Sequence, residues 1–376
     1  MILKNGLVMT KDFEIKELDV QIEGGKIKNI GENLCGDEIV DIKGKYLLPG
    51  FIDTHIHGAY GARISDDNAD LDKVTEYEKT QGVTSIAITT ASSEWNSLLG
   101  QIDLAVKKSK EKNGTRIAGI HLEGPFLSKK FKGAMNENNI IAPDIKVFDE
   151  LYDHGKGLIK IITIAPESEN AEEFIKYAVS KGVTVAMGHT DSTYDDAIRG
   201  VKAGITSSTH TFNAMRPFNH RETGVLGAAL TEESVSCEMI CDFVHLHPSA
   251  LMLIYKAKGA DRIKMVSDSG HAAGWDVKEF VVDGLTRYVV DGVVRLANGT
   301  IAGSAKTMLD GFKNLLSMGI PLGEVSKMAS INPAKALKME NEIGSIEVGK
   351  LADLVVMDKD YNVVSTYIDG ECVYNA

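Results

Sequence analysis

The sequence predicts an α/β protein, a (β/α)8 TIM-like barrel joined to a small β-sandwich module built from both termini. Eight apolar or β-branched runs alternate with segments whose apolar residues recur at helical spacing, as in parallel βα units. Three of the joints between them place Gly82, Gly182 or Gly204 just before a β-branched pair. Glycine tolerates the left-handed cap that ends a helix there. Both ends of the chain instead carry strand patterns with little helical periodicity.

Barrel strands are expected where short apolar runs end in polar residues. In chain order these runs are Tyr46–Thr54, Thr84–Thr90, Arg116–Leu122, Ile159–Ala165, Thr184–Gly188, Thr206–Thr211, Val235–Val244 and Arg262–Val266. Helical spacing is clear between them in Asp70–Thr80, Ala171–Ser180, Tyr194–Ala203 and Pro248–Lys258. Eight such units in about 290 residues match the usual size of a closed barrel.

The two ends of the chain are expected to form one module beside the barrel. Strand-like runs near the start and the end are Met1–Val8, Leu18–Glu23, Lys26–Ile30, Ala352–Met357, Val363–Ile368 and Glu371–Tyr374. Asp369-Gly370, between the last two runs, favours a tight hairpin turn. We therefore expect residues 1–48 and 340–376 to form the β module and residues 49–339 to form the barrel.

Composition narrows the class of protein. The 376 residues are 43% apolar and 25% charged, which is ordinary for a globular chain. The four cysteines are too few and too scattered for a disulfide scaffold, and the start has no apolar signal core, so a cytoplasmic protein is expected. A net charge of −12 argues against general binding of nucleic acid, and no apolar run is long enough to span a bilayer. A local arginine could still bind an anionic small substrate.

Five histidines fall where an expected strand ends, which is where a parallel barrel carries its active site. They are His55, His57, His189, His210 and His245. A single histidine at a strand end is usually an ordinary polar residue with its hydrogen bonds satisfied, but the joint pattern is much harder to explain in that way. His55 and His57 are two residues apart, so both point to the same face of a strand and can bind one ion.

Two acids complete this set. Glu123 follows an apolar strand in His121-Leu122-Glu123-Gly124-Pro125, and Asp268 follows the eighth strand. A lone aspartate before Ser-Gly is ordinarily a turn or cap residue, but its company favours a catalytic role. His121 has the parity of Glu123, and packing in the core or support of a ligand is as good an interpretation as metal binding.

Imidazoles and carboxylates together suit a divalent ion such as Zn²⁺, Fe²⁺, Mn²⁺ or Co²⁺, and the lack of paired cysteines argues against a closed structural zinc site. A bound divalent ion lowers the pKa of its water to about 7 and polarises a carbonyl. Hydrolysis of an amide also needs a group that takes a proton from water and delivers it to the departing amine, and Asp268 is the candidate for that role.

Motifs along nearly the whole chain resemble the amidohydrolase superfamily and, within it, the N-acetylglucosamine-6-phosphate deacetylase family. The opening PGFIDTHIHG at 49–58 and the closing GSIEVGKLADL at 344–354 are similar to the superfamily signatures. The deacetylase motifs are HLEGPF at 121–126, GHT at 188–190, THTFNAM at 209–215, DFVH at 242–245, SDSGHAAG at 267–274 and GTIAGSAKTM at 299–308.

The resemblance implies roles for individual residues. Glu123, His189 and His210 would bind the principal metal, and Asp268 would be the catalytic acid and base. Because both His55 and His57 are present, one or two ions per subunit are expected. Positions matching substrate contacts are Ala134, Asn213, Ala214, Arg221, His245, Ile301, Ala302 and Gly303. His271 lies in a stretch that departs from the family pattern, which bears on sugar preference.

Arg221 and His245 match residues that bind phosphate and sugar. A guanidinium suits a phosphate dianion, although without the resemblance a surface ion pair with Glu222 would be the preferred interpretation of Arg221. Part of the phosphate contact in the family comes from a partner subunit, which implies a homodimer.

The expected reaction is therefore hydrolysis of the acetamide of N-acetyl-D-glucosamine 6-phosphate. The alternatives are deacetylation of the galactosamine epimer, hydrolysis of a cyclic amide, and a catalytically silent barrel that serves as a binding protein. Many cyclic-amide hydrolases carry a carboxylated bridging lysine, whereas this chain has Glu123 at the bridging place. A silent barrel is expected to lose its ligands, and here all of them are present.

Overall fold

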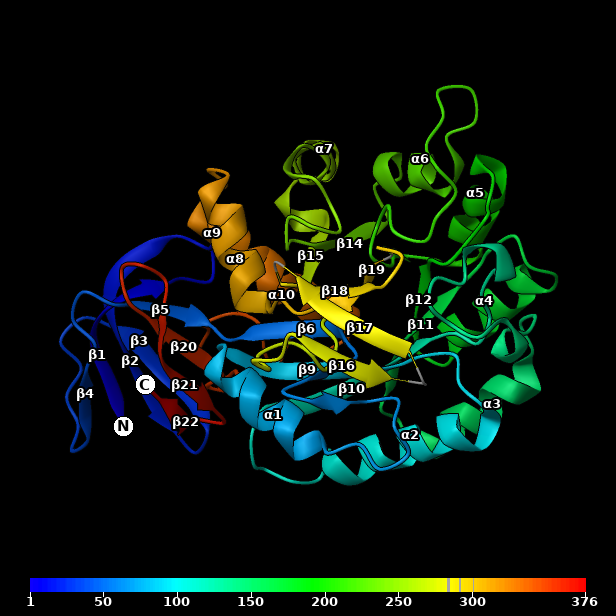
Figure 1. The fold of residues 1–376 in the computed structure, drawn as a ribbon. Helices are drawn as coiled ribbons and strands as arrows, with labels where there is room; N and C mark the ends of the chain where they lie inside the picture. The colour runs from blue at the N-terminus through cyan, green and yellow to red at the C-terminus, as the bar shows by residue number, and fades with distance from the viewer. Residues whose placement is uncertain (283–284, 291, 300) are drawn as a thin grey trace.

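Eight parallel strands with helices outside them form the barrel, so the predicted fold class is confirmed (Figure 1). The computed structural model describes residues 1–282, 285–290, 292–299 and 301–376. In hydrogen-bonded order the barrel strands are β6 (Phe51–Ile56), β9 (Val83–Thr90), β10 (Arg116–Glu123), β11 (Ile159–Ile164), β12 (Thr184–Met187), β13 (Ser207–Ser208), β14 (Ser236–Ile240) and β15 (Ile263–Val266).

The seam between the first and last strands is bridged just beyond β15. The His57 N–H donates to Ser269 O at 2.8 Å, and the Asp268 N–H donates to His55 O at 2.9 Å. The carboxylate of Asp53 accepts hydrogen bonds from the backbone N–H and the hydroxyl of Ser267. These contacts bring the end of β6 against the end of β15, where the predicted site residues lie.

The helices pack with their apolar faces on the barrel (Figure 1). They are α1 (Leu71–Thr80), α2 (Trp95–Lys108), α3 (Ile145–His154), α4 (Ala171–Ser180), α5 (Tyr194–Ala203), α6 (Gly224–Thr231), α7 (Pro248–Lys258), α8 (Met308–Ser317), α9 (Leu322–Ala329) and α10 (Ile331–Ala336), with single 3-10 turns η1 (Lys129–Phe131), η2 (Glu137–Asn139) and η3 (Ala260–Arg262). The three joint glycines do adopt positive φ, at 79°, 82° and 127°. None of the described helices is long and apolar enough to cross a membrane.

A plug of small and branched apolar side chains fills one end of the barrel. Ile52, Ala87, Ala118, Ile161 and Ala186 from five neighbouring strands pack against residues of and after α10, namely Ala334, Ala336, Leu337 and Ile343. These contacts lie toward the beginnings of the strands. Polar side chains are therefore free to gather at the opposite end.

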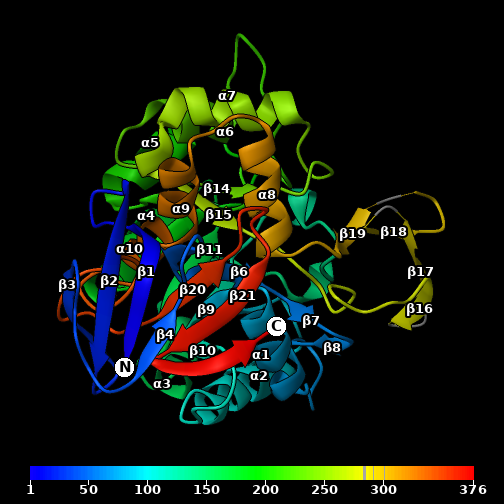
Figure 2. The same ribbon diagram turned by 90° about the vertical axis from the view of Figure 1, so that its left-hand side faces the viewer.

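Both termini enter one eight-stranded sheet beside the barrel, so the predicted joining across the chain is confirmed (Figure 2). Its strands are β1 (Ile2–Met9), β2 (Ile15–Glu23), β3 (Lys26–Gly31), β4 (Ile39–Asp41), β5 (Tyr46–Pro49), β20 (Leu354–Met357), β21 (Val363–Ile368) and β22 (Glu371–Asn375). The join is the antiparallel pair of β5 with β20. Asp369 and Gly370 make the expected hairpin turn with φ of 50° and 76°.

Three regions differ from the sequence-based expectation. A four-stranded antiparallel sheet follows β15 and projects from the barrel (Figure 2); it consists of β16 (Glu279–Val282), β17 (Leu285–Val290), β18 (Val293–Leu296) and β19 (Ile301–Ser304), and a small hairpin is formed by β7 (Gly58–Ala59) and β8 (Ala62–Arg63). The seventh strand ends at Ile240 rather than Val244, because the Asp242 carboxylate accepts the N–H groups of Val244 and His245 and turns the chain.

Candidate active site

Three of the predicted site residues have left-handed backbone conformations two positions beyond the end of a barrel strand. The φ angles are 49° at His189, 26° at His210 and 46° at Asp268. Such conformations are uncommon for residues other than glycine and are concentrated at functional sites, where the surrounding structure holds them. Each turns its side chain over the carboxyl end of the barrel, and His210 lies just beyond β13 rather than within a strand as expected.

Glu123, His189 and His210 converge on one point. The Nε2 atoms of His189 and His210 lie 3.1 Å and 3.0 Å from Glu123 Oε1, and they are 3.0 Å from each other. All three residues are buried. Ligand atoms about 2.1 Å from a tetrahedral ion lie about 3.4 Å apart, so this triangle needs only a small expansion to hold one.

The hydrogen-bond pattern of this triangle calls for a cation. His189 Nδ1 lies 2.7 Å from the carbonyl oxygen of Phe131, which only accepts, so Nδ1 carries the proton. In the neutral ring Nε2 is then a bare lone pair, and it faces the carboxylate of Glu123. Two acceptors at this distance repel each other unless a positive charge lies between them. The donor set of two imidazoles and a carboxylate therefore fits a divalent metal ion.

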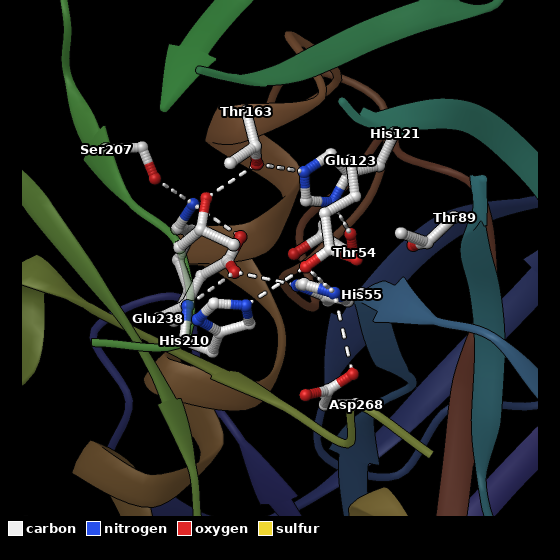
Figure 3. Close-up of polar contacts among 12 residues, drawn as sticks. Thr54, His55, Thr89, His121, Glu123, Thr163, Ser207, His210, Glu238 and Asp268 are labelled. Carbon is white, nitrogen blue, oxygen red and sulfur yellow. Dashed lines mark hydrogen bonds and ion pairs between the residues drawn. The ribbon is translucent and has the colours of Figure 1, made fainter. Parts of the chain in front are cut away.

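His55, His57 and Asp268 form a second group of ligand atoms beside the first. Asp268 Oδ1 lies 3.6 Å from His55 Nε2 and 3.4 Å from His57 Nε2. Glu123 faces both groups, with Oε1 3.3 Å from His55 Nε2 and Oε2 3.3 Å from His57 Nε2. Figure 3 shows His55 between Glu123 and Asp268. Glu123 thus has the place of a bridging carboxylate.

The electrostatics of the cluster demand positive charge. Burial alone would lower the pKa of His57, but hydrogen bonds to Asp268 and Glu123 raise that pKa to about 9. Burial alone would raise the pKa of Asp268, but the nearby His55 and His57 lower it. The pKa of Glu123 is likewise held well below its usual value, against burial, by His55 and His189. Both carboxylates are therefore ionised at neutral pH.

His121 is not in either of the groups around Glu123. Its Nδ1 lies 3.0 Å from the Thr54 carbonyl oxygen and its Nε2 lies 2.7 Å from the Thr163 hydroxyl (Figure 3). Both ring nitrogens thus have partners within the barrel, and burial lowers the pKa of the imidazole to about 3. Its ring packs edge-on against His55, with centroids 4.8 Å apart. Of the two interpretations open from the sequence, the geometry matches the supporting one.

Three of the predicted substrate positions lie in segments that contact His189, His210 or their neighbours. Asn213 Nδ2 donates to His210 O at 3.2 Å, and Ala214 O accepts the Thr190 N–H at 3.2 Å. Ala134 is exposed in the loop between η1 and η2, next to Gly133, which lies against the His189 ring.

His245 and β19 follow the last two barrel strands, β14 and β15, in the chain. His245 Nδ1 is 2.7 Å from Asp242 Oδ2, and this contact raises the pKa of the imidazole although burial opposes it. Ser304 Oγ donates to the same carboxylate oxygen at 3.2 Å. Ile301, Ala302 and Gly303 precede Ser304 in β19, which adjoins the Asp268 turn through a bridge of Ser304 with Ser269. The side chains of Ile301 and Ala302 lie outside the described part of the structure.

Arg221 has no described contact with the histidine cluster of its own chain. It is exposed in the segment between β13 and α6, which extends outward from the barrel (Figure 1). The surface ion pair with Glu222 does not form, since Glu222 Oε1 accepts the backbone N–H groups of Tyr194 and Gly224. Among the residues that the structure describes, no acid is paired with Arg221.

His271 lies at the base of the projecting sheet. It is buried and packs edge-on against Phe280, with ring centroids 4.5 Å apart. Its backbone carbonyl accepts the Gly61 N–H at 2.7 Å. The departure in the sequence after Asp268 thus falls where the two additional β elements meet the barrel.

Sequence reasoning missed several buried polar residues that hold this site. Glu238 and Lys264 lie inside the barrel, Asp242 holds His245, and Asp53 links the first and last strands. A charged residue within an otherwise apolar strand was the available signal for Glu238 and Lys264. Such a residue is rarely buried without a specific partner.

Comparison with known proteins places this geometry in a family. The model of the amidohydrolase family matches residues 46–373. The chain belongs to that family. An amidohydrolase has a barrel and a metal-binding cluster of the kind described above, and the chain is an enzyme that acts on amide bonds.

Individual relatives extend over the whole chain. A protein of Bacillus subtilis (strain 168) named N-acetylglucosamine-6-phosphate deacetylase is 34% identical over 384 residues, covering 100% of this chain and 97% of that protein. An N-acetylgalactosamine-6-phosphate deacetylase of Escherichia coli O157:H7 is 30% identical, covering 86% of this chain and 87% of that protein. The solved structure of an Asp-to-Ala mutant of N-acetyl-D-glucosamine-6-phosphate deacetylase from Mycobacterium smegmatis, in complex with N-acetyl-D-glucosamine-6-phosphate, has a TM-score of 0.92 and 32% identity, covering 100% of this chain and 99% of that chain.

Proposed function

We propose that the protein hydrolyses the acetamide of N-acetyl-D-glucosamine 6-phosphate to D-glucosamine 6-phosphate and acetate. The observation that carries the proposal is the convergence of Glu123, His189 and His210, with His55, His57 and Asp268 beside them, in a chain that resembles deacetylases of this sugar phosphate along its full length. One cation would be held by the first three residues. A second would lie between His55, His57 and Asp268, with Glu123 facing both.

The ion supplies a nucleophile and an electrophile when bound, because it acidifies water and polarises a carbonyl oxygen. Zn²⁺, Fe²⁺, Mn²⁺ and Co²⁺ all suit imidazole and carboxylate ligands. The chain contributes ligand atoms that already lie close together. Its two ionised carboxylates compensate the charge of the ion.

Asp268 takes the proton in the proposed reaction. Its carboxylate is ionised at neutral pH and its side chain is 18% exposed, so substrate and water can reach it. Water adds to the acetyl carbon while Asp268 accepts its proton. The same carboxyl group then gives that proton to the sugar nitrogen as the C–N bond breaks, which leaves acetate and the free amine.

Residues near the histidine cluster would recognise the sugar phosphate. Asn213, Ala214 and Ala134 would contact the sugar, and the backbone of β19 would line its binding site. His245 offers a positive charge to the phosphate, since Asp242 raises its pKa. Arg221 is exposed in the segment between β13 and α6, and we propose a homodimer in which it reaches the phosphate bound by the other subunit. We assign the reaction to the cytoplasm.

The galactosamine epimer is the second candidate substrate, because one of the relatives is named for it. Acetate release should be measured from N-acetylglucosamine 6-phosphate, its galactosamine epimer and unphosphorylated N-acetylglucosamine, with elemental analysis of the same protein. We expect the first compound to be used best and the unphosphorylated sugar to be used poorly. Equal turnover of phosphorylated and unphosphorylated sugar would contradict the roles given to His245 and Arg221.

A further inference from the structure

A buried ion pair lies within the barrel beside the histidine cluster, and the reaction proposed above does not use it. Glu238 on β14 and Lys264 on β15 are 0% and 1% exposed. They are direct partners in the register of the two strands, so both point to the barrel interior. Lys264 Nζ lies 3.3 Å from Glu238 Oε1 and donates to Ser207 Oγ at 2.6 Å.

A gain in folding stability does not by itself explain why such a pair is buried. Removing two charges from water costs several kcal/mol per ion, and apolar residues of similar size often replace a buried pair without loss. One end of the barrel interior is filled by small and branched apolar side chains. What the pair contacts is therefore the better guide to its role.

The second oxygen of Glu238 contacts two of the site histidines. Glu238 Oε2 lies 3.0 Å from His55 Nδ1 and accepts the backbone N–H of His210 at 3.2 Å. Lys264 beside it favours the ionised carboxylate, which can only accept. With a cation in the cluster the His55 ring would be neutral, and its one proton would be on Nδ1. His55 Nε2 is then left with its lone pair toward Glu123 and Asp268 (Figure 3).

A second contact holds the ring of His55 from the side. His121 packs edge-on against it and is itself fixed by Thr54 and Thr163. The Thr163 hydroxyl is in turn 2.7 Å from that of Thr209, beside His210. The rotation of His55 is thus restricted on one side while Glu238 selects which nitrogen faces the cluster.

We propose that Glu238 is a positioning residue, which with its counter-charge Lys264 sets the tautomer, orientation and ligand strength of His55 and anchors the backbone of His210 for cation binding. This inference rests on the proposed function, because it requires that the cluster bind a metal. A ligating histidine gains basicity and a fixed orientation when its other nitrogen donates to a carboxylate, and loss of such a partner typically weakens metal binding about 10-fold to 100-fold.

Cobalt binding to the full-length protein tests this role. The protein is freed of metal by a chelator and titrated with Co²⁺ alone, and binding is followed by visible absorption and elemental analysis. Glu238→Gln keeps the shape but removes the charge, and Glu233→Gln at an exposed position on the approach to the same strand is the matched control. We expect Glu238→Gln to bind Co²⁺ 10-fold to 100-fold more weakly than the control, with an altered absorption spectrum at saturation.

A double variant separates positioning from stability. Glu238→Gln alone leaves the Lys264 ammonium buried and unpaired, which destabilises the fold. Glu238→Gln with Lys264→Met removes that charge, so we expect it to recover thermal stability while Co²⁺ binding remains weak. Recovery of wild-type Co²⁺ affinity in the double variant would overturn the inference.

The inference and the proposed function fail in different ways. Wild-type Co²⁺ affinity in Glu238→Gln of a chain that deacetylates the sugar phosphate contradicts the inference alone. Co²⁺ uptake that depends on Glu238 in a chain that releases no acetate supports the inference and contradicts the proposed function.

Discussion

Strand β10 carries a charged side chain at each of its ends, half-buried Arg116 and buried Glu123, and the two have opposite kinds of surroundings. At its beginning Arg116 is paired with Asp353 and Asp369 of the terminal β module. At its end Glu123 is surrounded by the Nε2 atoms of four histidines. The first cluster has complementary donors and acceptors, whereas the second has an excess of acceptors facing one another.

The difference separates a structural contact from a functional site. Arg116 offers five N–H donors to two carboxylates, and Asp353 also accepts the Asp369 N–H, so this contact is complete within the protein. The Glu123 cluster is completed only by a cation. We therefore expect perturbation of the first to alter stability with activity retained, and perturbation of the second to alter activity.

Removal of metal should have the largest effect on activity. It should alter the cluster around Glu123 and leave the Arg116 contact unchanged. A chelator is expected to abolish acetate release, and Zn²⁺, Co²⁺ or Mn²⁺ should restore it. Because the ion binds only the folded chain, its removal should also lower the Tm. Activity that persists in protein shown by elemental analysis to be free of metal would break the comparison.

Changing Asp268 to Asn should lower turnover by several powers of ten while the cation held by Glu123, His189 and His210 stays bound. Asparagine keeps the shape of the side chain but cannot take a proton from water. The measurement is kcat for acetate release beside elemental analysis and thermal melting. Near-normal turnover in a metal-loaded variant would mean that another group moves the proton.

The barrel, the histidine cluster and one turn were predictable from the sequence, because each is signalled by residues close together in the chain. Strand runs ending in histidine or acid predicted the barrel and the cluster, because the carboxyl ends of parallel strands meet at one rim. The turn at Asp369 and Gly370 was predictable from two adjacent residues. These signals are read from neighbouring positions alone.

The missed features depend on distant partners. Arg116 of β10 pairs with Asp353, just before β20, and Glu238 of β14 pairs with Lys264 of β15. Each charge looks ordinary in the sequence until its partner is known. The projecting sheet of β16 to β19 was missed because its strands form contacts mainly with one another, at half-buried positions. His210 differs from expectation because β13 has only two residues before a left-handed turn.

Replacing Arg116 by Met tests whether the contact at the beginning of β10 affects stability without affecting activity. We expect the free energy of unfolding to fall by about 2–4 kcal/mol, since Asp353 would remain buried without its partner. Denaturant unfolding measures the loss, and kcat/KM of the folded variant should stay within about twofold of the wild type, because β10 still presents Glu123.

Asp369→Asn is the matched control for Arg116. This carboxylate is 36% exposed, so its loss should cost under about 1 kcal/mol. A large fall in kcat/KM of folded Arg116→Met, with full metal content, would show that the two ends of β10 are coupled.

The smallest expected effect is a pH dependence of KM. It comes from the contact between His245 and Asp242, which is complete within the protein and supports substrate binding in the proposed reaction. Asp242 raises the pKa of His245 above its usual value against the effect of burial, so the imidazolium persists near neutral pH and loses its charge as pH rises through the raised pKa. Phosphate monoesters have a second pKa near 6, so the substrate keeps its charge above about pH 7. KM for the phosphorylated sugar should therefore rise roughly fivefold toward alkaline pH, the equivalent of about 1 kcal/mol in a charge-assisted hydrogen bond.

Asp242→Asn should move that rise in KM to lower pH, because the imidazolium of His245 loses the carboxylate that stabilises it. The unphosphorylated sugar serves as the internal control, since its KM should not follow His245. If the KM values of both sugars rose together, His245 would act on a part of the substrate other than phosphate. If neither changed, the Asp242 contact would belong with Arg116 among those that only hold the fold.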